Sequence, residues 1–97
     1  MISLEDCIAL SGLTEEEILA IAEHEHLSEA VACGLAQYLD DNPGGHARVR
    51  DMIVEDIRAA QTAGDKDHIR SLLHVLHHFL RQHPEVRPQH HPWSAVF

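Results

Sequence analysis

Apolar residues recur at intervals of three and four through most of this chain, and that spacing constrains its fold more than any other feature. The clearest stretch ends before Pro84, because a proline there cannot continue a helix. Its apolar stripe consists of Ile69, Leu72, Leu73, Leu76, Phe79 and Leu80. No stretch alternates apolar and polar residues long enough to predict a strand. The sequence therefore predicts an all-α fold.

Capping and stop residues divide the pattern into about five helices. The side chains able to cap a helix N-terminus are Ser3, Thr14, Ser28 and Asp65. The predicted helices span residues 4–10, 15–26, 29–41, 46–63 and 66–83. In the third of them, we expect an inward stripe of Val31, Leu35, Tyr38 and Leu39. The two longer C-terminal helices should form a hairpin, because Gly64 lies in a short link between them.

The length of 97 residues is enough for one domain with a modest hydrophobic core. We assign residues 1–83 to a single helical domain, a compact bundle of about five short helices. Residues 84–97, which contain three of the four prolines, are expected to form a loose, extended C-terminal tail.

The charge of the chain is strongly negative. Seven lysines and arginines stand against 16 acidic residues, so the formal net charge is −9 with histidine neutral. Such a field repels polyanions, which argues against nucleic acid as a partner. No apolar run is long enough to span a bilayer and no secretion signal is visible, so we expect no membrane association and a cytoplasmic location.

Two cysteines, Cys7 and Cys33, lie in apolar helical contexts and form no CxxC motif. Two cysteines do not make the dense framework of a small disulfide-stapled protein. We therefore expect buried, reduced thiols.

Several ionisable residues interrupt the apolar faces. In the second helix the inward stripe of Ile18, Leu19, Ile21 and Ala22 runs on into Glu25 and His26, whereas Glu23 and His24 are expected to point away. Asp56 lies near the middle of the apolar face of the fourth helix, where an unpaired carboxylate is costly. His77 lies at the edge of the stripe of the fifth helix.

These residues give a candidate metal site between helices, made of Glu25, His26, Asp56 and His77. Mixed carboxylate and imidazole ligands suit iron, manganese or zinc. The match to known ligand patterns is incomplete. Di-metal sites in ferritin-like helical bundles use two Glu-x-x-His pairs on facing helices, and Glu23-x-x-His26 is the only such pair in this sequence. The alternative is that Asp56 accepts hydrogen bonds from a histidine or a helix N-terminus and that no metal or other cofactor binds.

No motif for catalysis is evident, since the chain has neither a phosphate-binding loop nor an activated nucleophile. Val54 and Val75 fall outside the main stripes and leave apolar surface for a partner. The sequence therefore favours a small acidic protein-interaction module that is non-catalytic and binds a partner protein or itself as a homo-oligomer, for example a homodimer. A metal-binding helical protein is the alternative.

Overall fold

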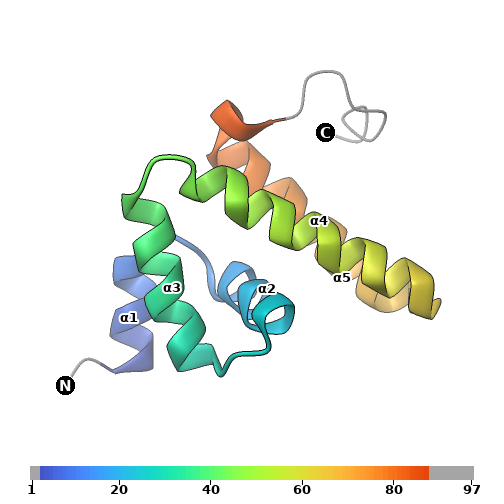
Figure 1. The fold of residues 1–97 in the computed structure, drawn as a ribbon, viewed down its shortest axis with the longest axis horizontal. Coiled ribbons are helices and arrows are strands. Elements are labelled where there is room, and N and C mark those ends of the chain that lie inside the picture. Colours follow the sequence, from blue (N-terminus) through green and yellow to red (C-terminus); the bar gives the residue numbers. More distant parts are fainter. Residues whose placement is uncertain (1–2, 88–97) are drawn as a thin grey trace.

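The computed structural model describes residues 3–87, and within that range the chain is all-helical, as the sequence predicts (Figure 1). The elements are α1 (Leu4–Ser11), α2 (Glu15–Glu25), α3 (Glu29–Asp41), α4 (Gly45–Ala63), α5 (Lys66–Gln82) and a 3₁₀ turn, η1 (Pro84–Val86). These bounds agree with the predicted helices to within one residue or two. None of the described helices is long and apolar enough to cross a membrane.

Side-chain caps begin four of the five helices. Ser3, Ser28 and Asp65 each accept a hydrogen bond from the backbone N–H three residues later. Thr14 forms a full capping box: its Oγ1 accepts from the N–H of Glu17 at 3.2 Å, and its own N–H donates to Glu17 Oε1 at 2.9 Å. Local hydrogen bonds that the sequence specifies therefore fix where these helices begin.

The helices pack around α2, which contacts α3, α4 and α5. The two longest helices, α4 and α5, lie side by side (Figure 1). α1 packs against α3 (Figure 1). The largest fully buried apolar side chains are Ile18, Ile21, Cys33, Val49, Ile53, Leu76, Phe79 and Leu80. All five helices thus enclose one hydrophobic core, to which α1 contributes at its edge.

α3 buries a different face from the one that its bulky residues predict. Val31 and Tyr38 are 57% and 63% exposed, whereas Ala32, Cys33 and Ala36 are fully buried. Small side chains face inward because α1, α2 and α4 all pack against α3, and a close-packed core leaves them little room. The inward stripe predicted for this helix is therefore wrong at Val31 and Tyr38.

α4 begins directly against the end of α3. Gly45 is buried, its N–H donates to the carbonyl of Asn42 at 3.0 Å, and a side chain at this position would overlap the carbonyl group of Leu39. Only glycine allows two backbones to approach this closely. The same short segment that ends α3 therefore also sets the start of α4.

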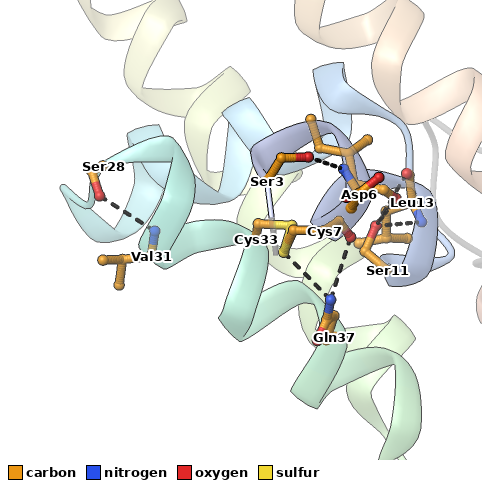
Figure 2. The surroundings of a disulfide bond; sticks show 10 residues. Ser3, Asp6, Cys7, Ser11, Leu13, Ser28, Val31, Cys33 and Gln37 are labelled. Carbon is orange, nitrogen blue, oxygen red and sulfur yellow. Dashed lines mark hydrogen bonds between the residues drawn. A yellow bond between two sulfur atoms is a disulfide. The ribbon is translucent and has the colours of Figure 1, made fainter. Parts of the chain in front are cut away.

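Cys7 and Cys33 form a disulfide bond that joins α1 to α3, so the expectation of two reduced thiols is wrong (Figure 2). Their Cα atoms are 6.3 Å apart, which is within the range that a disulfide spans. Gln37 Nε2 donates to the backbone carbonyl of Cys7 at 3.3 Å beside the bond (Figure 2). The two cysteines are 26 residues apart, so only the packing of α1 on α3 brings them together.

The first residues of the predicted tail form η1, which packs against α4 and α5. Arg50 Nη1 donates a hydrogen bond to the carbonyl of Val86 at 2.8 Å and holds this turn in place. Residues 88–97 lie outside the described residues, so the expected loose tail stays a prediction for that part of the chain.

Candidate functional site

A groove of about 470 Å³ lies where the ends of α2, α4 and α5 meet. It is lined by Glu23, His24, His26, Glu55, Asp56, Ala59, Ala60, Ala63, Asp65 and His68, and we call it the acid-histidine groove. Four of these residues are carboxylates and three are histidines, in a chain whose formal charge is −9. The groove therefore favours a positively charged occupant.

Asp56 is the buried acid of this groove. The residue is only 6% exposed, and its Oδ2 has no hydrogen-bond partner among the residues that the structure describes. Burial, followed by the nearby charge of Glu23 and a hydrogen bond that the protonated carboxyl group shares with Glu23, raises the pKa of Asp56 to about 7, although His24 and His68 act in the opposite direction. At neutral pH this carboxyl group is therefore divided between its protonated and ionised forms, unless a cation reaches it.

Histidine-carboxylate pairs cross the groove from helix to helix. His24 Nε2 on α2 lies 2.5 Å from Glu55 Oε2 on α4, and His68 Nε2 on α5 lies 2.6 Å from Glu23 Oε1 on α2. Burial lowers the pKa of His24, but the hydrogen bond to Glu55 and the charges of Asp56, Glu55 and Glu25 outweigh burial and raise it overall. The pairs tie three helices together at the groove.

The four residues of the predicted metal site do not gather at one point. Asp56 and His26 line the same groove. Glu25 lies outside its lining, 3.3 Å from His24 Nδ1, and His77 is a half-buried residue of α5 that is also not part of the lining. The structure therefore brings together two of the four.

The reason lies at the end of α2. The last helical residue is Glu25, and His26 adopts a left-handed conformation with φ 56° and ψ 46°. The helical repeat used to place Glu25 and His26 on the inward stripe does not continue through this turn. His26 is exposed, whereas His24 and Glu25 are both half-buried, so the expectation that His24 points away from the core is wrong.

Four residues of the groove were not predicted as site residues from the sequence: Glu23, His24, Glu55 and His68. The helical spacing could have indicated His24 as an inward-facing residue, because it follows the buried residues Ala20 and Ile21 by four and three positions. No local pattern indicates Glu55 and His68, since only the packing of α4 and α5 on α2 brings them to His24 and Glu23.

An apolar pocket of about 210 Å³ adjoins the acid-histidine groove on the α2 and α5 side. Its lining is Glu16, Leu19, Ala20, Glu23, His68, Ser71, Leu72 and Val75, and two of these residues, Glu23 and His68, also line the groove. Leu19 is 45% exposed although it belongs to the predicted inward stripe of α2. The face therefore combines an apolar recess with an adjacent acidic one.

This arrangement can hold a cation. Carboxylates and imidazoles are ligands for divalent transition metals, and carboxylates also form strong charge-assisted hydrogen bonds with guanidinium and ammonium groups. Comparison with known proteins gives no relative: no family model, curated protein or solved structure matches this chain.

Proposed function

We propose that this chain is a non-catalytic protein-interaction module whose binding face is the acid-histidine groove together with the adjoining apolar pocket. Its occupant is a basic amphipathic segment of a partner protein. An apolar side chain of that segment enters the pocket, and a neighbouring arginine or lysine enters the groove.

The unpartnered oxygen of Asp56 is the observation that carries this proposal. A buried polar atom without a hydrogen bond destabilises the fold, and a protein retains few of them. A guanidinium or ammonium group donates to such an oxygen and stabilises the ionised carboxylate. The partner would thus supply a hydrogen-bond donor to Asp56 Oδ2, which accepts none from the described residues of the free chain.

The apolar pocket gives the segment its second contact. Leu19 and Val75 border the pocket, and Glu16 and Glu23 lie at the same recess. This is the pattern of an apolar groove that receives one face of an amphipathic helix, with acidic residues beside it to select basic flanks. Both recesses share Glu23 and His68, so a single segment can reach both.

Charge favours a different protein over a second copy as the occupant. Two copies would each carry a formal charge of −9 and would bring acidic faces together, which costs binding energy. The self-association expected from the sequence is therefore the weaker version of the proposal.

A divalent metal ion is the second candidate occupant, because Asp56, His24 and His68 line one groove, although their ligand atoms do not all come within 4.8 Å of one another. Such mixed ligands suit zinc, manganese or iron. Elemental analysis of protein purified without a histidine tag tests it. A metal that co-purifies with the native chain and is lost from Asp56→Asn supports this candidate, and a metal-free preparation removes it.

The disulfide bears on where the protein works. Disulfides persist in oxidising compartments and are rare in the reducing cytosol. We therefore propose an oxidising environment in place of the cytoplasmic location expected from the sequence. Alkylation of free thiols at the moment of cell lysis tests this, and full modification of both Cys7 and Cys33 would contradict it.

A synthetic amphipathic peptide with leucines on one face and flanking arginines tests the main proposal. The control is a peptide of the same length in which glutamates replace the arginines. Titration calorimetry should show binding of the basic peptide only. NMR shift changes should concentrate in α2, α4 and α5.

Two variants of the chain locate the contacts. Asp56→Asn should weaken binding by about 10- to 150-fold, since a hydrogen bond to a charged group is worth about 1.5–3 kcal/mol. Leu19→Ser should weaken it at least tenfold, since burial of a leucine side chain is worth about 1.5–3 kcal/mol. Asp51→Asn, an exposed acid on the same helix as Asp56, is the matched control. Equal binding of both peptides, or shift changes confined to another face, would overturn the proposal. Light scattering of the free chain reports on self-association separately.

A further inference from the structure

A second cluster of ligand-type side chains lies on the opposite ends of α4 and α5, away from the acid-histidine groove. His46 is in the first turn of α4, His83 caps the end of α5, and Glu85 belongs to η1. Asp40 approaches from the end of α3. Four chain segments therefore meet at this point.

The ligand atoms of His46, His83 and Glu85 all lie within 4.8 Å of one another. Glu85 Oε1 is 3.0 Å from His46 Nδ1 and 3.8 Å from His83 Nδ1. Two ligand atoms that are each about 2.0–2.1 Å from a tetrahedral zinc ion lie about 3.3 Å apart. The observed distances lie on either side of that value, so small side-chain adjustments would allow all three atoms to contact one ion.

We propose that His46, His83 and Glu85 bind a divalent transition-metal ion of the zinc class, with Asp40 as the residue that orients His46. Two histidines and one carboxylate form a recognised three-ligand set that leaves a further coordination position for water or another ligand. This site does not depend on the proposed partner face.

Asp40 provides the outer contact that metal-bound histidines usually have. His46 Nε2 lies 2.8 Å from Asp40 Oδ1, while its other ring nitrogen, Nδ1, faces Glu85. Both contacts are hydrogen bonds only when the ring carries two protons. A metal ion takes the place of the proton on Nδ1 and leaves Nε2–H donating to Asp40, which is the carboxylate-histidine-metal arrangement of many sites.

The two imidazole rings are held before any ion arrives. The side chains of His46 and His83 are 25% and 14% exposed, and their ring centroids are 4.0 Å apart. Phe79, a fully buried residue of α5, packs against both rings, with centroid distances of 6.1 Å to His46 and 4.5 Å to His83. Glu85 is more exposed, so its side chain can move onto the ion.

Calorimetric titration of the tag-free, chelator-treated chain with Zn²⁺ tests the proposal, and Co²⁺ absorption reports the ligand geometry. We expect one tight site whose occupation raises the thermal midpoint, because the ion joins η1 and α5 to α4. Glu85→Gln and His83→Ala should weaken Zn²⁺ binding at least tenfold. Asp40→Asn should weaken it by about 10- to 100-fold, as loss of an outer carboxylate commonly does.

His74→Ala is the matched control, since His74 is an exposed histidine of the same helix. The absence of stoichiometric Zn²⁺ binding would overturn the proposal. So would binding that is unchanged in both Glu85→Gln and His83→Ala. Binding that is lost in Asp56→Asn but retained in Glu85→Gln would place the ion in the acid-histidine groove and would also overturn it.

Discussion

Replacement of Asp56 by asparagine should stabilise the chain at neutral and alkaline pH and have little effect in acid. The folded-state pKa of Asp56 is about 7, against an ordinary value of 3.8. Between these two values the folded chain keeps a proton that the unfolded chain has lost, so the stability of the native chain falls as pH rises. Asparagine is neutral at every pH and does not undergo this loss.

The size of the effect follows from the pKa difference. About three pKa units at 1.36 kcal/mol each give an upper limit of about 4 kcal/mol, and we expect about 2–4 kcal/mol in practice. The difference between Asp56→Asn and the native chain should grow from about pH 4 to about pH 7 and stay constant above that range.

Urea unfolding followed by circular dichroism at a series of pH values measures this difference directly. Asp51→Asn is the control, because Asp51 is exposed on α4 and forms a surface ion pair with Arg50. Its effect should stay within about 0.5 kcal/mol at every pH. A constant difference for Asp56→Asn across the pH series, or a loss of stability at alkaline pH, would refute the reasoning.

Three further predictions concern the backbone and the disulfide, each measured as the free energy of unfolding in urea. His26→Gly should stabilise the chain by about 1 kcal/mol, because a left-handed conformation is strained for histidine and unstrained for glycine. Unchanged stability in this variant would contradict the prediction. Replacement of both Cys7 and Cys33 by alanine should lower stability under oxidising conditions by about 3.5 kcal/mol, because the unfolded chain regains the entropy that a 26-residue loop had removed. A loss below about 1 kcal/mol would contradict this stabilising role of the disulfide. Gly45→Ala should lower stability by about 3 kcal/mol or more, because the added methyl group overlaps the end of α3. Gly34→Ala should raise stability by about 1 kcal/mol, because its methyl group meets open space and alanine favours the helix. Similar effects at both positions would be inconsistent with the packing described.

The positions of the helices were predictable because their signals are local. The caps at Ser3, Thr14, Ser28 and Asp65 each act within four residues, and the apolar repeats that follow need no tertiary information. The faces were less predictable. In α3 the small residues Ala32 and Ala36 face the core and Tyr38 does not, because close helix packing selects for size as well as for hydrophobicity.

The candidate site was predictable only where one helix defines it. Asp56 stood out because a carboxylate interrupts a regular apolar face, and it is indeed buried. His68 and Glu55 became recognisable only once α2 lay against α4 and α5, since each pairs with a residue more than thirty positions away. The disulfide escaped prediction for the same reason, because nothing near Cys7 in the sequence indicates that Cys33 is its neighbour.

The bond between Cys7 and Cys33 fastens the N-terminal helix α1 to α3. α1 packs mainly on α3. Besides the backbone that runs through α2, the disulfide is the covalent link between these two helices. Reduction would leave α1 held by side-chain packing and by the hydrogen bond from Gln37 to the carbonyl of Cys7, while α2 to α5 retain their mutual contacts. How firmly the N-terminal helix covers Cys33 should therefore depend on the redox state of the surroundings.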